Sequence, residues 1–247
     1  MLLEDRLHQL GNQLFRFRSY TPLLLIPLLY LEVGESGLSA KSQWNMSWEL
    51  FCFGVALTGL AVRALTIGFV PKGTSGRNTT SQRAQVLNTT GLYSSLRNPL
   101  YLGNYLIVLG VMLLSQNWEL VLIGTLLFFA AYIPIILVEE RYLLKTFGQE
   151  YEQFAAQTPC LLPAWRWKRP EYPWSWKMLL RREHDTMFST ILTFVAIEHL
   201  RYFRMTDSFS PEPLWLYIGG IGAIVWLVLK FLKRCTKVLK NQPTASL

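Results

Sequence analysis

Long apolar runs separated by basic segments constrain this chain more than any other feature of its sequence. Hydrophobic residues fill 51% of the 247 positions and charged residues only 16%, a more apolar balance than soluble domains usually show. A membrane-spanning helix needs roughly 17 to 25 mainly apolar residues. The candidate runs lie near residues 20–34, 48–70, 99–115, 118–138, 186–203 and 213–232. We therefore predict an all-α, polytopic membrane protein with about six transmembrane helices.

The first and fifth runs are the weakest candidates. Pro22 and Pro27 interrupt the first run, and Glu198 and His199 interrupt the fifth. Each of these two runs either spans the membrane or forms a tilted helix at its surface. The first run begins near residue 20 and no small-residue cleavage site follows it, so we expect it to be retained.

Lysine and arginine are distributed unevenly along the chain. Twenty of the 24 lie in segments 1–19, 71–98, 139–185 and 230–247, which fall on one side of the membrane if six helices span it. Because cytoplasmic loops carry such an excess, we predict that both termini are cytoplasmic. Membrane topology and anionic lipid headgroups account for the net charge of +8, so we expect no nucleic-acid partner.

Cysteine and histidine positions argue against a disulfide framework and against a metal site. The three cysteines are unrelated in spacing and form no CxxC pair. His184, Glu198 and His199 match no zinc or iron spacing. We therefore predict that the protein binds no metal.

The stretch SSLRNPLYLGNYL, residues 94–106, places polar residues at the entrance of the third apolar run. Asn98 followed by Pro99 is a good helix start, because asparagine caps free backbone amides and proline suits the first helical position. A helix over 99–115 rises about 25 Å, and after the turn QNW a helix over 118–138 returns through about 31 Å. This hairpin, 99–138, brings its two outer ends together.

The two ends that meet carry the sequences LRNPLYLGNY and VEERYLLKTFGQEY. Arg97 at a helix N-terminus attracts a carboxylate or phosphate, Glu139 and Glu140 attract an ammonium or sulfonium, and Tyr101 offers an aromatic face. S-adenosylmethionine carries all of these groups, so its chemistry suits this end of the hairpin. A second interpretation stays open, in which Arg97 and the glutamates only pair with each other at the membrane boundary.

Both sequences resemble motifs of a known family. LRNPLYLGNY is similar to the Arg-His-Pro-x-Tyr-x-Gly motif of the isoprenylcysteine carboxyl methyltransferase and phospholipid methyltransferase superfamily, and EERYLLKTFGQEYEQFAAQTPCLLP resembles its Glu-Glu, Phe-Gly, Tyr and two-proline tail. The resemblance, over residues 87–163, implies an integral-membrane methyltransferase that uses S-adenosylmethionine. The residues that it assigns to the cofactor are Arg97, Asn98, Pro99, Tyr101, Gly103, Glu139 and Glu140. Of these, Arg97 and Glu140 are the predicted catalytic residues.

Two other functions are compatible with parts of the sequence. Membrane sterol reductases share a similar proline and tyrosine motif and use NADPH. Their tail carries an Arg-Asp pair and a nearby cysteine, whereas EERYLLKTFGQEY has a glutamate pair and no cysteine, which favours the methyltransferase. The second alternative is a membrane scaffold that keeps the hairpin without turnover.

Asn98 departs from the family pattern, which usually has histidine at that position. Asparagine forms hydrogen bonds but exchanges no proton. Methyl transfer to an ionised carboxylate or phosphate needs no general base, so positioning and desolvation suffice. An amine acceptor would have to lose a proton, and we therefore expect an anionic oxygen as the acceptor.

The segment VPKGTSGRNTTSQRAQVLNTT, which begins at Val70, is the candidate acceptor site. Lys72, Ser75, Arg77 and Asn78 lie around two glycines, and their amides, hydroxyls and cations suit a phosphate. Alternatively, the segment is a solvated turn whose positive charge only reflects the orientation of the protein in the membrane, and the two interpretations stay equally open. The predicted acceptor is a lipid or lipidated molecule: a lipid phosphate, as in the lipid A phosphate methyltransferases that this sequence also resembles, or a prenylcysteine carboxylate.

These assignments divide the chain into three parts. We predict an N-terminal transmembrane region over 1–86 with a basic loop at 71–86, a methyltransferase core over 87–163, and a C-terminal part over 164–247. The last part opens with WRWKRPEYPWSWK, whose alternating tryptophans and basic residues are typical of a segment at the membrane surface. Its helix pair either builds a lipid-entry groove or forms a subunit interface.

Overall fold

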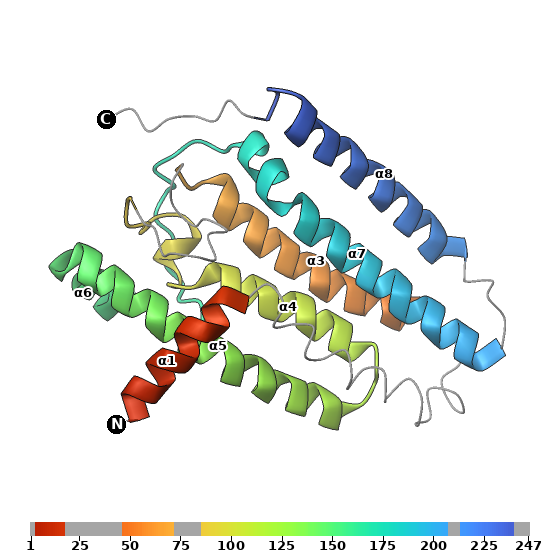
Figure 1. Ribbon diagram of the computed structural model, residues 1–247, viewed down its shortest axis with the longest axis horizontal. Helices are drawn as coiled ribbons and strands as arrows, with labels where there is room; N and C mark the ends of the chain where they lie inside the picture. Colours follow the sequence, from red (N-terminus) through yellow and green to blue (C-terminus); the bar gives the residue numbers. More distant parts are fainter. Residues whose placement is uncertain (1–2, 18–45, 72–84, 207–212, 240–247) are drawn as a thin grey trace.

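The computed structural model describes residues 3–17, 46–71, 85–206 and 213–239, and this part of the chain is almost entirely helical. The helices are α1 (Leu3–Phe17), α3 (Met46–Gly68), the short η2 (Leu92–Ser94), α4 (Pro99–Leu113), α5 (Trp118–Phe147), α6 (Gln149–Gln157), α7 (Trp176–Thr206) and α8 (Pro213–Cys235). Figure 1 shows α3, α4, α5, α7 and α8 as long rods that run roughly side by side. The predicted all-α class is confirmed.

Three of the described helices, α3, α5 and α8, are long and apolar enough to cross a membrane. The prediction of an integral membrane protein is therefore confirmed. The predicted run 99–115 forms the shorter apolar helix α4, and run 186–203 lies inside the more polar α7. The predicted run 20–34 lies outside the described residues, so the number of six spans, like the cytoplasmic location of the termini, stays a prediction.

The second helix of the predicted hairpin is longer than its apolar run. Helix α5 continues past Val138 to Phe147, and Gly148 ends it. Residues such as glutamate, leucine and lysine favour helix, and no glycine or proline interrupts 139–147. The polar end of the hairpin is therefore a helical extension beyond the apolar span, which carries Glu139 and Glu140 on a regular backbone.

Glycines set the contact between α3 and α4. A Cβ added to Gly103 would lie 2.5 Å from the Arg63 Cγ and 2.9 Å from the Gly59 carbonyl oxygen, and one added to Gly110 would lie 2.6 Å from the Cys52 carbonyl oxygen. Small residues at such positions let two membrane helices approach closely. Gly103 and Gly110, seven residues apart, share one face of α4, and that face packs against α3.

Two buried ion pairs join α7 to α3. Near one end of α3, the Arg201 Nη2 donates to Glu49 Oε1 at 2.5 Å. Toward the other end, the Arg63 guanidinium binds Glu183 through two hydrogen bonds, at 2.7 and 2.8 Å. Because α7 lies outside the motif match, these pairs show that the predicted C-terminal part packs directly on the helices of the predicted N-terminal part. The three-part division of the chain stays a prediction.

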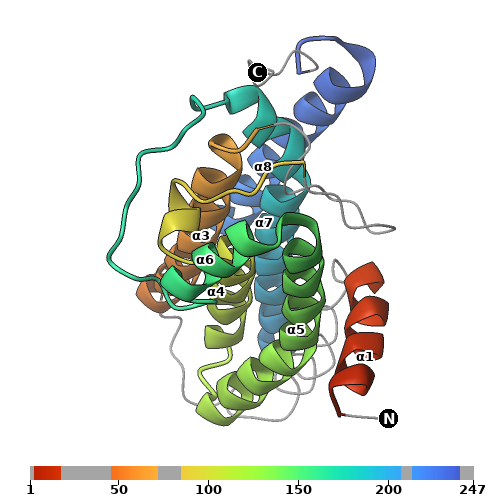
Figure 2. The same ribbon diagram turned by 90° about the vertical axis from the view of Figure 1, so that its left-hand side faces the viewer.

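Helix α1 lies across α5 rather than along it, and Figure 2 shows it at the side of the bundle. Phe15 of α1 is buried in a cluster with Tyr101 of α4 and with Phe128 and Tyr132 of α5. The cluster lies between the two helices of the hairpin, close to the end that carries the two sequence motifs, which we call the motif end. Helix α1 therefore covers one side of the region where the two motifs meet.

Candidate cofactor site

The two motifs meet through an ion pair between Arg97 and Glu140. Arg97 precedes α4 and Glu140 lies in the extension of α5, so the out-and-back hairpin brings them together as predicted. The Arg97 Nε donates to Glu140 Oε1 at 2.9 Å and the Nη2 donates to Oε2 at 3.1 Å. The two side chains are 18% and 20% exposed, so the pair is only partly shielded from the surroundings.

The other edge of the Arg97 guanidinium holds the chain that follows α5. Its Nη1 donates to the carbonyl oxygens of Ala155 at 2.8 Å and Thr158 at 2.9 Å. The Arg97 amide also donates to the Pro159 carbonyl oxygen at 2.9 Å. A bend at Gly148, which has a φ of 52°, turns α6 back toward the hairpin so that these oxygens can be reached. Arg97 thus fixes the tail to the start of α4.

Asn98 occupies the N-cap position of α4, but its side chain caps no helix amide. The Asn98 Nδ2 instead donates to Glu140 Oε1 at 3.1 Å and to the Cys160 carbonyl oxygen at 3.3 Å. The expectation that this side chain caps the helix is therefore wrong. The Nδ2 orients the side chain, because it donates to a carboxylate and a carbonyl oxygen, and charged acceptors form the stronger hydrogen bonds.

Tyr151 and Cys160 join this group of residues, although the sequence reasoning assigned neither to the site. The Tyr151 hydroxyl is buried close to the Glu140 carboxylate. Burial, and then the charge of Glu140, raise the pKa of Tyr151. The signal was present, since the quoted tail sequence contains both the tyrosine and the cysteine.

Burial also raises the pKa of the Cys160 thiol, with a further contribution from Glu140 and an opposing one from Arg97. The Cys160 Sγ lies 3.7 Å from Glu140 Oε1 and 3.5 Å from the Asn98 Nδ2. Raising the pKa keeps the thiol protonated over a wider range. Cys160 is therefore a neutral, weakly polar neighbour of the ion pair.

The remaining predicted cofactor residues lie elsewhere in the hairpin. Tyr101 is buried and its ring packs edge-on against Tyr132, 5.2 Å between centroids. Pro99 is the first residue of α4, Gly103 packs against α3, and Glu139 is partly exposed beside Glu140. Of the predicted cofactor residues, the structure thus brings together Arg97, Asn98 and Glu140. The predicted acceptor residues Lys72, Ser75, Arg77 and Asn78 lie outside the described residues.

A second polar group lies deeper in the bundle. Arg63 binds Glu183, as described above, and its Nη1 donates to the Asn104 Oδ1 at 2.5 Å. Glu183, the glutamate that binds Arg63, lies on α7. Asn104 lies on α4 between the motif and the middle of the helix, so α3, α4 and α7 share this group. No local sequence pattern predicts this polar group, because Glu183 lies 120 residues from Arg63 along the chain.

Among the described residues, no three histidine, cysteine, aspartate or glutamate side chains gather as a metal site would require.

Residues 46–150 match the phospholipid methyltransferase family. The family resemblance predicted from the two motifs is confirmed. The matched range contains α3, α4 and α5, including the glycine contacts and both members of the Arg97–Glu140 pair. It ends one residue before Tyr151.

Individual relatives match parts of the chain. The protein-S-isoprenylcysteine O-methyltransferase of Schizosaccharomyces pombe is 33% identical over 78 residues, which are 32% of this chain and 33% of that protein. The nickel-cobalt-cadmium resistance protein of Alcaligenes xylosoxydans xylosoxydans is 27% identical over 126 residues, 51% of this chain and 57% of the relative. The cobalt-zinc-cadmium resistance protein of Cupriavidus metallidurans is 26% identical over 138 residues, 56% and 62% of the two chains.

The chain thus spans less than two thirds of the length of each of these curated relatives. No solved structure matches the chain.

Proposed function

We propose that this protein is an integral-membrane methyltransferase that uses S-adenosylmethionine and acts on a lipid or lipidated acceptor through an anionic oxygen. The observation that carries the proposal is the meeting of Arg97, Asn98 and Glu140 at one end of the hairpin, inside or adjoining the two family motifs. The family match over residues 46–150 supports the reaction class. The relative from Schizosaccharomyces pombe, whose name specifies O-methyl transfer to isoprenylcysteine, supports the acceptor class.

The donors and acceptors of the site fit a zwitterionic cofactor. Arg97 has five N–H groups, and four of them already bind Glu140, Ala155 and Thr158, which leaves one on Nη2. The buried Tyr151 hydroxyl adds a donor beside Glu140. These two groups suit a carboxylate, and the glutamates suit an ammonium. S-adenosylmethionine would supply the methyl group.

Glu140 accepts hydrogen bonds from Arg97 and Asn98, so its charge is largely compensated before any ligand arrives. A cofactor ammonium would therefore share this carboxylate with Arg97, and Glu140 would orient the cofactor more than attract it. Arg97 and Asn98 in turn hold the motif in place for that contact. The role of the site is then to fix the donor and the acceptor in line and to exclude water.

Asn98 supports an acceptor that is already ionised. Its amide is engaged with Glu140 and the Cys160 carbonyl oxygen, and an amide exchanges no proton with a substrate. A lipid phosphate or a prenylcysteine carboxylate needs no base. The basic segment that contains Lys72, Ser75, Arg77 and Asn78 would hold the anionic headgroup.

Radiolabelled cofactor tests the proposal. Membranes that contain the protein are incubated with S-adenosylmethionine carrying a labelled methyl group, and lipids and protein methyl esters are then separated. We expect label in one of these fractions with the wild type and a loss of at least about tenfold with Glu140→Gln, because one hydrogen bond to a charged group contributes about 1.5 to 3 kcal/mol. Glu150→Gln, on the exposed face of α6, is the matched control and should retain activity.

Calorimetry on the purified protein separates the alternatives. A methyltransferase binds S-adenosylmethionine or S-adenosylhomocysteine, whereas a reductase of the sterol type binds NADPH and a scaffold binds neither. Absence of binding to both methyl-donor forms would rule out the proposed function.

A further inference from the structure

Five consecutive residues between α6 and α7, Trp165 to Arg169, expose their side chains. We name this segment the Trp-basic loop. Trp165 is fully exposed and Trp167 is 58% exposed. Arg166, Lys168 and Arg169, which alternate with or follow the tryptophans, are exposed as well. Trp165 and Trp167 thus expose two large apolar side chains with one residue between them, and exposed apolar surface of this kind can mark an interaction site.

Hydrogen bonds fix the backbone beneath these side chains. The Gly91 amide donates to the Lys168 carbonyl oxygen at 3.0 Å, and the Lys168 amide donates to the Ser94 Oγ at 2.9 Å. The Ser95 Oγ donates to the Arg166 carbonyl oxygen. The backbone of the loop is therefore fixed while its side chains stay exposed, with the Arg166 Nη1 donating to the Gln157 carbonyl oxygen at 3.3 Å. A partner then meets a preorganised surface, and little ordering entropy is lost on contact.

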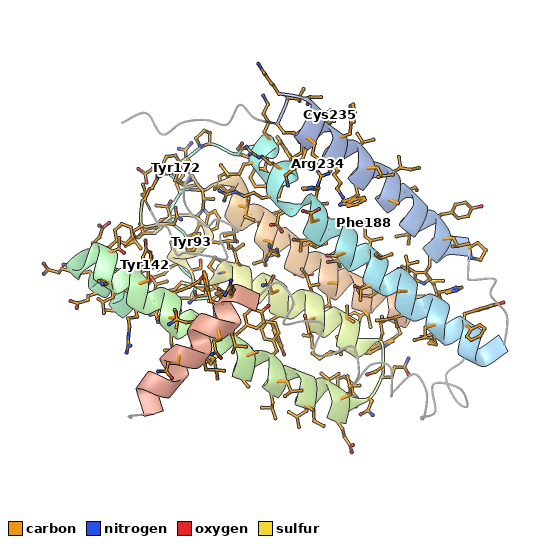
Figure 3. The ribbon with its side chains drawn as sticks, viewed as in Figure 1. Tyr93, Tyr142, Tyr172, Phe188, Arg234 and Cys235 are labelled. Carbon is orange, nitrogen blue, oxygen red and sulfur yellow. The ribbon has the colours of Figure 1, made fainter. Side chains whose placement is uncertain are left out.

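The loop lies at the motif end of the bundle. Ser95, to which it is bonded, is two residues before Arg97, and the Ser175 amide at the start of α7 donates to the carbonyl oxygen of Gly68 at the end of α3. In Figure 3, Tyr93, Tyr142 and Tyr172 mark this same end of the molecule, where the irregular segments gather. The loop therefore stands where the apolar parts of α3 and α4 reach their boundary.

Tryptophan is enriched at the boundary between lipid and water, because its ring is apolar and its N–H is polar. Arginine and lysine beside it are attracted to anionic headgroups by about 1 kcal/mol each near the surface. Three such cations favour the docked position by on the order of a hundredfold. A lipid surface satisfies both residue types at once, which a purely apolar or a purely acidic partner would not.

We propose that the Trp-basic loop docks onto an anionic lipid surface, with its tryptophans among the headgroups and its cations against the lipid phosphates. The inference goes beyond the proposed function and does not depend on methyl transfer, since it concerns the position of the loop in any bilayer that holds the protein.

Fluorescence quenching of the full-length protein in nanodiscs tests the proposal. The signal is the emission that the wild type has and the variant Trp165→Phe/Trp167→Phe lacks. It is measured in phosphatidylcholine and in phosphatidylcholine with phosphatidylglycerol, with acrylamide as a neutral aqueous quencher and with lipids brominated near the headgroup. We expect brominated lipid to quench this emission, and acrylamide to quench it at least about twofold less when phosphatidylglycerol is present.

Two comparisons make the result specific. Arg166→Gln/Lys168→Gln/Arg169→Gln keeps both tryptophans, and it should abolish the dependence on lipid charge. Trp118, 66% exposed at the opposite end of the hairpin and followed by Glu119, is the control: the emission lost in Trp118→Phe should not depend on lipid charge. High salt should reduce the effect in the wild type, because about 1 M salt screens charges beyond about 3 Å.

The opposite outcome is equally clear. If acrylamide reaches the emission of Trp165 and Trp167 equally in both bilayers and brominated lipid leaves it unquenched, the loop projects into water. The proposal is then overturned, and the surface is open to a protein partner instead.

Discussion

The two ends of the bundle each contain an ion pair, and the pairs differ in how they are enclosed. Glu49 and Arg201 are 1% and 7% exposed, and the Trp215 Nε1 donates to the second Glu49 oxygen at 3.1 Å. Arg97 and Glu140 are 18% and 20% exposed, and Arg97 also binds backbone oxygens of an irregular segment. The Glu49–Arg201 pair joins α3 to α7. Arg97, by contrast, joins the start of α4 to Glu140 on α5 and to the backbone at the end of α6.

From this difference we infer that the enclosed Glu49–Arg201 pair, the sealed pair, mainly stabilises the fold, and that the Arg97–Glu140 pair mainly serves the candidate site. A sealed pair has no water to replace a lost partner, so removal of one charge is costly. A partly exposed pair loses less on disruption and stays within reach of a ligand. Structural stability should therefore depend most on Arg201, and the candidate site most on Arg97.

The largest expected effect is on stability at the sealed end. Arg201→Gln leaves Glu49 and the nearby Glu198, 3.5 Å from the Arg201 Nε, without their guanidinium. We expect the free energy of unfolding in detergent to fall by about 3 to 5 kcal/mol. Glu49→Gln should cost less, because Arg201 keeps Glu198. Equal losses for the two variants would show that the carboxylates do not share the arginine.

A double-mutant cycle at Arg63 and Glu183 tests the pair between the two ends. Its side chains are 12% and 3% exposed, so it is nearly as enclosed as the sealed pair. We expect Arg63→Gln and Glu183→Gln each to cost about 3 kcal/mol in unfolding, and the double variant to cost less than their sum. Additive losses would mean that the two charges act independently.

At the motif end, Arg97→Lys keeps the positive charge but removes the planar guanidinium, which binds several acceptors at once. One ammonium cannot bind Glu140 and two carbonyl oxygens in that geometry. We expect a loss of about 1 to 2 kcal/mol in stability, smaller than at the sealed end, with cofactor affinity reduced at least about tenfold. Titration calorimetry and denaturant unfolding measure the two effects separately. A larger loss of stability than in Arg201→Gln would reverse the comparison.

Two asparagines at helix starts allow a finer test. Asn117 Oδ1 accepts from the amides of Glu119 and Leu120, at 2.9 and 3.1 Å, and so caps α5. Asn98 binds Glu140 instead. Asn117→Ala should cost about 1 kcal/mol in unfolding and leave cofactor affinity unchanged. Asn98→Ala should lower the affinity, and an equal effect of both on binding would contradict the assignment of Asn98.

The smallest effect concerns the Cys160 thiol. Its raised pKa lowers the thiolate fraction at pH 8, so maleimide should label it more slowly than the exposed Cys235. Glu140→Gln removes a charge that raises this pKa and should speed labelling, whereas Arg97→Gln removes one that lowers it and should slow labelling. Rates followed by mass spectrometry give the sign, and the reverse order would show that exposure and not charge controls the thiol.

The same two asparagines show how far the sequence could predict this structure. Each precedes a helix and suits the cap position, and the local pattern does not tell them apart. Asn98 differs because Glu140, 42 residues away, takes its amide. The apolar runs predicted α3, α5 and α8, and hairpin geometry predicted that Arg97 and Glu140 meet.

Partners from irregular or distant segments were not predictable in this way. The position of Tyr151 depends on a bend after α5, and that of Glu183 on the packing of α7 against α3. Neither the bend nor the packing leaves a periodic signal in the residues themselves. The limits of α4 and α7 differed from the apolar runs for a related reason, since helix formation follows backbone preference as well as hydropathy.

Gly148 gives the motif end a property that no contact reveals. A side chain added there would meet nothing within 4 Å, yet its φ of 52° with a ψ of −124° suits glycine alone among the ordinary residues. The direction in which α6 leaves α5 therefore depends on the backbone conformation of this one residue, and α6 turns as a rigid arm about it. Gly148→Ala would change the angle of the arm and carry the Ala155 and Thr158 oxygens away from Arg97, without touching a single residue of the site.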